Sequence, residues 1–155
     1  MKLKYCLLVL AVSSFLASLV QTNFGKVDIS LERLDTNNSQ YIYYDLYKPK
    51  SATSENKAPF IAIIPGFQRS KEALSNIAIE LSRRGYVVGL IDPYAQGLSS
   101  SSLSRRAATT EGYGMFALID HIYESDQYDY INKQLLGTTG PVSYTHLTLP
   151  TNREV

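Results

Sequence analysis

Two neighbouring stretches near the front of the chain alternate apolar and polar side chains. In the first, Val27, Ile29 and Leu31 alternate with polar residues, which is the period of a β-strand. The residues at 37–39 that follow are typical of turns. The second stretch, residues 40–48, also has the strand period, so the pair predicts an antiparallel hairpin. One face of this second strand should carry Tyr41, Tyr43, Asp45 and Tyr47, and the other Ile42, Tyr44 and Leu46.

The next part of the chain holds two continuous apolar runs with a helical pattern between them. The runs PFIAIIPG and YVVGLID are typical of strands that are buried on both faces. Ser70 is a candidate N-cap for the helix, and Gly85 suits the position just after its C-terminus. This strand–helix–strand unit predicts parallel pairing through a right-handed crossover. The expected buried stripe of the helix is Leu74, Ile77, Ala78 and Leu81.

A second unit of the same kind follows. Residues 93–106 are polar and rich in serine, which predicts a loop. A helix is expected over residues 110–124, and a third buried strand over 134–140. The fold class is therefore α/β, a β-hairpin that leads into a parallel β-α-β-α-β sheet.

The first 22 residues form a separate segment. Lys2 and Lys4 precede an uninterrupted apolar stretch over residues 5–20, which predicts a signal peptide or a signal-anchor helix. A buried core helix is the alternative. As the only cysteine, Cys6 excludes an internal disulfide. We therefore expect an exported or membrane-anchored protein that meets the membrane through this segment.

Composition and motifs exclude several functions. The net charge of +1 offers no general attraction for nucleic acid, so no such partner is expected. The segment after the first buried strand, PGFQRS, lacks the glycines of a dinucleotide site or a phosphate-binding loop. The two histidines, His121 and His146, are isolated from other metal-binding residues. We expect neither a metal nor a cofactor.

Four pieces, in order, resemble the first half of the α/β-hydrolase family. They are the strand and turn IAIIPGFQRSKE, the segment NIAIELSRRGYVVGLIDPYAQGLSS, the helix TEGYGMFALIDHIY and the strand INKQLLGTTG. The last strand in this family normally runs into a Gly-x-Ser-x-Gly nucleophile elbow. The likeness spans residues 27–140, and within the family it is nearest to esterase branches such as dienelactone-hydrolase-like proteins. Pro65 stands where the family commonly has histidine.

The resemblance implies a mechanism and a place for its parts. A serine just after Gly140 would attack an acyl carbon, and backbone N–H groups would hold the resulting oxyanion. One donor would be the N–H of Phe67, with Gln68 and Tyr94 at the rim of the pocket. Gln96 and Ser99 are further candidates for the mouth of the pocket, although an ordinary solvated loop is the favoured interpretation for Tyr94, Gln96 and Ser99. The triad acid and histidine would come later than any residue of this chain.

Two polar residues before the tail invite a catalytic interpretation that the resemblance does not support. Asp92 precedes the family's glycine-containing loop, so local hydrogen bonding is its expected role. His121 lies inside the second helix, and we expect it to be at the surface or half-buried.

The tail over residues 141–155 breaks the pattern. Ser143 and His146 lack the sharp turn and the orienting acid of a catalytic set. The segment VSYTHLTLPT instead resembles the translation of a transposase sequencing adapter in one reading frame. We therefore expect a partial hydrolase domain over residues 26–140 with a non-native tail.

As given, the chain should be inactive, and its last strand should be a bare edge prone to aggregation. The alternatives are a non-catalytic binding protein of this fold and a nucleotide- or flavin-binding domain, although the latter lacks its glycine loop.

Overall fold

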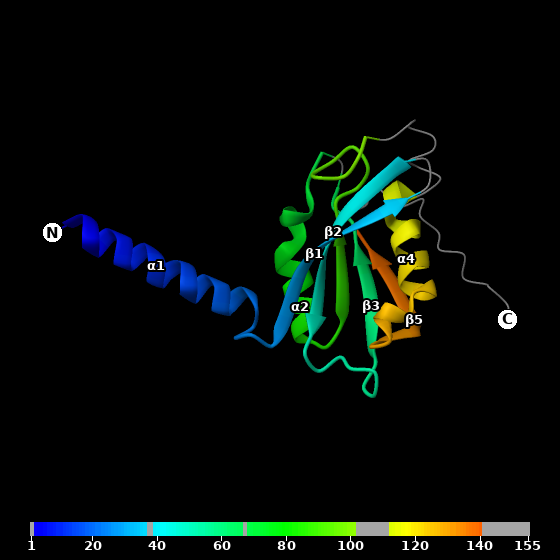
Figure 1. Ribbon diagram of the computed structural model, residues 1–155, viewed down its shortest axis with the longest axis horizontal. Coiled ribbons are helices and arrows are strands. Elements are labelled where there is room, and N and C mark those ends of the chain that lie inside the picture. Colours follow the sequence, from blue (N-terminus) through cyan, green and yellow to red (C-terminus); the bar gives the residue numbers. More distant parts are fainter. Residues whose placement is uncertain (1, 37–38, 67, 102–111, 141–155) are drawn as a thin grey trace.

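The protein is a single sheet flanked by helices, with one further helix projecting away from it (Figure 1). The computed structural model describes residues 2–36, 39–66, 68–101 and 112–140. The described residues contain five strands in the spatial order β1-β2-β4-β3-β5. Their bounds are β1 (Val27–Thr36), β2 (Gln40–Pro49), β3 (Ala58–Ile63), β4 (Val87–Ile91) and β5 (Ile131–Thr139).

The strand pairing confirms the predicted fold class. Strand β1 pairs antiparallel with β2, and β2 pairs antiparallel with β4. Strand β3 lies parallel to both β4 and β5. The faces of β2 also separate as predicted, because Tyr44 belongs to one apolar cluster and Tyr47 to the other. The alternation of side chains along a strand therefore divides the core into two layers.

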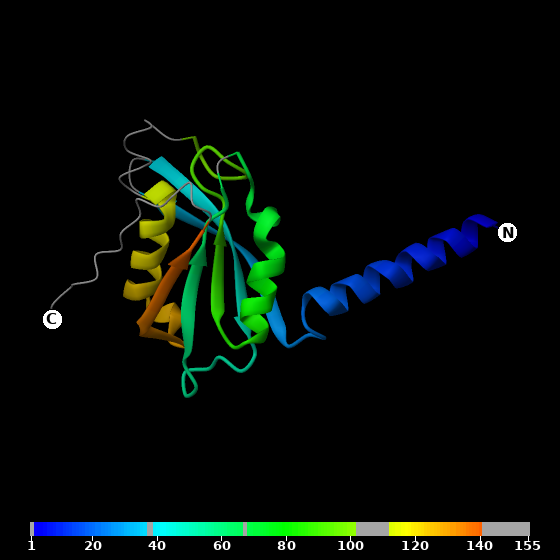
Figure 2. The same ribbon diagram turned by 180° about the vertical axis from the view of Figure 1, so that it is seen from behind.

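Two helices cover the opposite faces of the sheet (Figure 2). Helix α2 (Ser75–Arg83) packs on the face that carries Val88 and Leu90 of β4. Helix α4 (Met115–Glu124) packs on the other face, where Leu118 and Ile122 meet Phe60 in the larger cluster. All five of these side chains are essentially inaccessible to water. Sheet faces covered in this way are the usual arrangement for parallel strands.

The start of α2 differs from the prediction. Residues Lys71–Leu74 form a 3₁₀ turn, and the side chain of Ser70 makes no capping hydrogen bond to it. Ala78 is fully buried against the sheet, but Ile77 is 43% exposed, so its predicted burial is wrong. Helix α2 packs across β4, β2 and β1, and Ile79 rather than Ile77 packs against the apolar cluster beside Ala78.

The end of α2 agrees with the prediction. Gly85 has φ +93°, and its N–H donates to the carbonyl of Ser82, while the N–H of Tyr86 donates to Leu81. This pair of bonds is a Schellman motif, in which glycine takes the left-handed position at no steric cost.

The second unit also begins at other residues than predicted. Helix α4 starts at Met115, after the 3₁₀ turn Gly112–Gly114, and residues 110–111 lie outside the described chain. Strand β5 starts at Ile131, directly after the 3₁₀ turn Asp126–Tyr128, rather than at residue 134. It lies at the edge of the sheet, and Leu135 is 55% exposed. Burial of this strand on both faces is therefore wrong.

The N-terminal segment forms α1 (Lys2–Gln21), which extends away from the sheet (Figure 1). Its residues Leu3–Gln21 have a mean hydropathy of 2.0 and are 0% buried in the protein. By length and composition this helix can cross a membrane, as a signal peptide or an anchor does. In this structure it is not a buried core helix.

A glycine in β4 offers a test of the core. A Cβ at Gly89 would lie 2.9 Å from the ζ-carbon of Phe60 and 3.0 Å from a methyl group of Leu118. We expect Gly89→Ala to lower the free energy of unfolding by about 1–3 kcal/mol through overpacking. Chemical denaturation of the detergent-solubilised chain, followed by circular dichroism, measures this.

The matched control is Gly137→Ala in β5, where the added Cβ would have its nearest neighbours at 3.9 Å. This substitution should be neutral or slightly stabilising, since glycine weakens a strand. Equal losses in the two variants would contradict the packing argument.

Candidate active-site scaffold

The carboxyl ends of the three parallel strands meet at one end of the sheet. Beyond β3 the chain continues through Ile64 and Pro65, both buried. The N–H of Ile64 donates to the carbonyl of Thr139 at 3.1 Å, so the ends of β3 and β5 lie side by side. A Cβ at Gly140 would lie 2.7–2.8 Å from a methyl group and the carbonyl oxygen of Ile64. Glycine is therefore needed where the chain leaves β5.

Asp92 organises the loops at this end. It follows β4, is 1% exposed and accepts the N–H of Lys71 on Oδ1 at 2.8 Å. Its Oδ2 accepts the N–H of Leu98 at 3.1 Å, and its main-chain carbonyl accepts the hydroxyl of Ser99 at 2.6 Å. The predicted hydrogen-bonding role of Asp92 is confirmed. One carboxylate thus joins the loop after β3 to the loop after β4.

Lys71 completes a buried ionic cluster that the sequence analysis missed. Its ammonium nitrogen lies 2.9 Å from a carboxylate oxygen of Glu72 and 3.6 Å from one oxygen each of Asp45 and Asp92. The Lys71 side chain is only 5% exposed. One feature of the sequence could have indicated the cluster. The alternating pattern of β2 places the Asp45 carboxylate on the same strand face as Tyr47, which is buried. A buried carboxylate needs a cation or hydrogen bonds.

The pKa values of the cluster reflect burial and charge together. Burial lowers the pKa of Lys71, but Glu72, Asp45 and Asp92 outweigh it and raise the pKa above its usual value. Burial raises the pKa of Asp45, and the nearby Lys71 only partly offsets this. The pKa of Glu72 falls to about 2, first through a hydrogen bond from Ser70 and then through Lys71. Lys71 therefore stays protonated at neutral pH.

Further hydrogen bonds hold the loop after β4 in place. The N–H of Arg69 donates to Oε1 of Gln96 at 2.8 Å, a second link between the two loops. The hydroxyls of Ser99 and Ser100 accept the N–H groups of Tyr43 and Tyr41 at 2.9 and 3.0 Å. These serines thus extend the contact with β2. Ser99 is therefore tied to the sheet, whereas Ala95, Gly97 and Leu98 of the same loop are exposed.

The predicted site residues Gln68 and Tyr94 differ in their location and exposure. Phe67 lies outside the described residues, so its N–H stays a prediction. Gln68 is exposed, with φ +60°, in the loop after β3. Tyr94 is buried, and its hydroxyl lies 2.6 Å from that of Thr36. Their place at the rim of a substrate pocket also stays a prediction.

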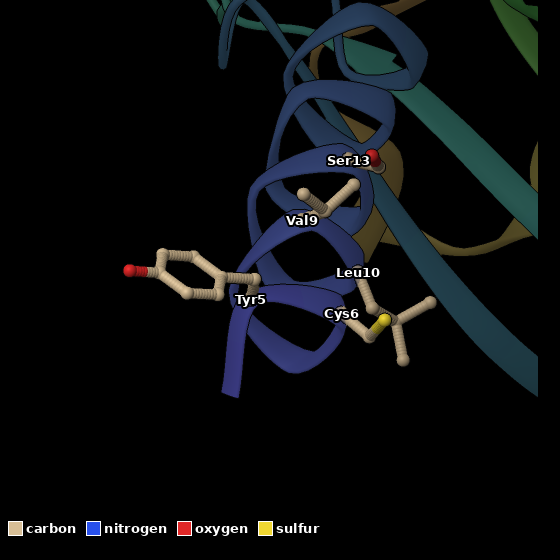
Figure 3. A pocket seen from close by; sticks show the side chains of 5 residues that line it. All are labelled: Tyr5, Cys6, Val9, Leu10 and Ser13. Carbon is tan, nitrogen blue, oxygen red and sulfur yellow. The ribbon is translucent and has the colours of Figure 1, made fainter. Parts of the chain in front are cut away.

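A cavity of about 400 Å³ lies between β1 and α4. Tyr94 and Thr36 line it together with His121, and Gln68 does not. His121 is half-buried, as predicted, and its Nε2 lies 3.3 Å from the hydroxyl of Tyr128. A second hollow of similar size lies on the bare surface of α1 (Figure 3).

The described residues bring the ends of the parallel strands together, and their histidine is not paired with a serine or a cysteine. His121 is the one histidine among them, and it hydrogen-bonds a tyrosine instead of a serine or a cysteine. Ser143 and His146 lie outside the described chain. Within residues 2–36, 39–66, 68–101 and 112–140, no group of three metal-binding side chains occurs. What this arrangement can do is hold two loops rigidly beside the end of β5.

Gly97 tests the role of Asp92. Gly97 has φ +53°, and a Cβ there would overlap the Asp92 carboxylate. We expect Gly97→Ala to displace this carboxylate and to lower the free energy of unfolding by about 2–4 kcal/mol, from backbone strain and lost hydrogen bonds. The same denaturation measurement applies.

Gly85→Ala is the matched control, because its φ is also positive but nothing lies within 4 Å of the added Cβ. It should cost only about 1 kcal/mol. A cost for Gly97→Ala no larger than this would show that the Asp92 contact is unimportant.

Lys71→Met tests the buried cluster. This change leaves Asp45 and Asp92 without their cation, and we expect a loss of about 3–5 kcal/mol in the free energy of unfolding. Lys50→Met is the control, since Lys50 lies 3.8 Å from Asp28 and both side chains are at least 60% exposed. Its expected effect is below about 1 kcal/mol. Similar effects at the two lysines would contradict a structural role for the cluster.

The architecture is shared with solved hydrolases, although no protein-family model and no curated protein matches the chain. A hypothetical protein from Pseudomonas aeruginosa is 24% identical with a TM-score of 0.60, over 73% of this chain and 35% of its own. An α/β hydrolase from a Penicillium species is 19% identical with a TM-score of 0.58, over 73% and 37%. A bacterial heroin esterase is 13% identical with a TM-score of 0.60, over 84% and 40%.

The chain spans about two fifths or less of the length of these three proteins. The similarity covers between 73% and 84% of this chain. The chain has an incomplete α/β-hydrolase fold.

Proposed function

We propose that the chain is the first part of a serine hydrolase that acts on an ester, thioester or related acyl bond. The observation that carries this proposal is the close contact between the ends of β3 and β5. Ile64 and Thr139 are hydrogen-bonded, and Gly140 packs against Ile64 without room for a side chain. A nucleophile just after Gly140 would therefore lie beside the loop that follows β3.

The chemistry of acyl transfer needs this proximity. When a serine attacks an acyl carbon, the negative charge that develops on oxygen is stabilised by backbone N–H groups already in position. In this proposal one donor is the N–H of Phe67 and the other is that of the residue after the nucleophile. Lys71 and Asp92 support the geometry by fixing the loop after β3 from its far end. They act as positioning residues and do not touch the substrate.

The proposal extends to the rest of the protein. We take residues 141–155 as a non-native tail, with the triad acid and histidine in a missing later part. The exposure of Leu135 on the edge strand β5 supports further strands or helices beyond it. The substrate would be a small acyl compound, and α1 would place the protein in or beyond a membrane. The chain as given would then be inactive.

The test is to read the source DNA across the Gly140 codon and to express the complete reading frame. We expect the sequence to continue into Gly-x-Ser-x-Gly, and a fluorophosphonate probe to label that serine in the complete protein. Its Ser→Ala variant and the present 155-residue chain should both remain unlabelled. If the printed tail is encoded and ends at a stop codon, the hydrolase proposal fails and a non-catalytic binding role replaces it.

A further inference from the structure

The connection between α1 and the sheet is held by hydrogen bonds and is not an extended linker. The N–H of Phe24 donates to the carbonyl of Leu19 at 2.6 Å, and that of Val27 to Thr22 at 3.0 Å. The guanidinium of Arg83, at the end of α2, donates to the carbonyl of Val20 at 2.7 Å. A cation thus satisfies a carbonyl at the C-terminus of α1, where the helix dipole favours positive charge. The sheet is therefore held close to the end of α1.

Helix α1 itself has the length and surface of a membrane-spanning helix. Its 20 residues correspond to roughly 30 Å, the thickness of the hydrocarbon core of a bilayer. Along its first half the side chains of Tyr5, Val9 and Leu10 extend away from the helix with no other part of the protein against them (Figure 3). A helix that is apolar around its surface and unburied in the protein needs an apolar environment.

The surface beside this junction carries both apolar and basic side chains. Phe24 is 70% exposed, and Ile29 and Leu31 of β1 are also exposed. Ile29 and Leu31 point to the same side of the sheet as Val27, which packs in the cluster beneath α2. Apolar side chains at the edge of a sheet and beside a spanning helix are suited to the membrane interface.

Basic residues surround these apolar ones. Lys26 and Lys50 are exposed and lie close together, because the N–H of Lys50 donates to the carbonyl of Lys26 at 2.9 Å. Arg83 and Arg84 share the single carboxylate of Glu80, and Lys50 faces Asp28. These four cations therefore face two carboxylates, a local positive excess that the net charge of +1 for the whole chain does not reveal.

We propose that this junction surface rests on the headgroups of the bilayer that α1 crosses, and that its cations bind anionic phospholipid. The junction surface consists of Phe24, Lys26, Ile29, Leu31, Lys50 and Arg83. Continuity with α1 and the local positive charge both select a lipid surface over a protein partner. The inference is independent of the acyl chemistry proposed above. It places strand β5, at the opposite edge of the sheet from β1, away from the membrane (Figure 1).

The experiment uses tryptophan fluorescence, because the chain contains no tryptophan. Leu31→Trp places the probe on the junction surface, and Leu135→Trp places it on β5 at the opposite edge of the sheet. The two leucines are matched, with exposures of 54% and 55%. The full chain is incorporated into phosphatidylcholine vesicles with or without phosphatidylglycerol, and both contain a lipid with a nitroxide quencher on its headgroup.

We expect Leu31→Trp to be quenched strongly in the vesicles that contain phosphatidylglycerol and weakly in phosphatidylcholine alone. Leu135→Trp should be quenched weakly in both. Adding Lys26→Gln and Lys50→Gln to Leu31→Trp should lower the ratio of docked to undocked protein roughly fivefold for each cation removed. Quenching of Leu31→Trp that equals that of Leu135→Trp, or that does not depend on lipid charge, overturns the proposal.

A second measurement tests insertion separately. Cys6, the single cysteine, should react with a membrane-impermeant maleimide only after detergent is added. Rapid labelling in intact vesicles would mean that α1 does not cross the bilayer, and the proposal would fail at that step. Labelling that requires detergent, together with lipid-independent quenching, would leave α1 inserted but reject contact between the junction surface and anionic headgroups.

Discussion

The buried contact between Lys71 and Asp92 is the interaction on which the carboxyl end of the sheet depends. Asp92 directly follows β4, Lys71 ends the loop after β3, and Asp45 reaches the same ammonium group from β2. Removing these charges from water is costly, and the Asp92 carboxylate offsets this cost by also accepting the N–H groups of Lys71 and Leu98. Three segments that are far apart in sequence are thereby held in one arrangement.

Close packing of the main chain makes this arrangement specific. Gly97 leaves room for the Asp92 carboxylate, and Gly140 lets the chain pass directly over Ile64. Any side chain at either position would have to displace a buried group. The loop after β3 is thus limited on one side by the ionic cluster and on the other by the end of β5. Such rigidity is what preorganised N–H donors require in acyl-transfer chemistry.

The edge of the sheet formed by β1, together with α1, is suited to a different environment. Here α1, Phe24 and the exposed residues of β1 combine apolar surface with basic side chains, and Arg83 links α2 to the end of α1. The same sheet therefore carries a buried polar cluster at the carboxyl ends of its parallel strands and a surface suited to lipid along its β1 edge. The two are neighbours, because Leu31 of β1 pairs in register with Asp45 of the cluster.

Local patterns in the sequence determined the hairpin, the strand–helix–strand units and the Gly85 cap, because the strand and helix periods depend only on neighbouring residues. The hydrogen-bonding role of Asp92 was implied by the resemblance to the hydrolase family and not by these patterns. The patterns did not reveal the exposure of Ile77 or the attachment of Ser99 and Ser100 to β2.

Local patterns also did not reveal the Lys71 cluster. Except for Glu72, its members are separated by 21 residues or more in the sequence. The spacing of apolar residues along a helix indicates which side chains favour burial, but not which of them contact the sheet. Likewise, a lysine beside a glutamate resembles a solvated surface pair until distant strands bring two carboxylates to it. Tertiary structure decided these features because they depend on contacts between segments, and one-dimensional periodicity carries no information about such contacts.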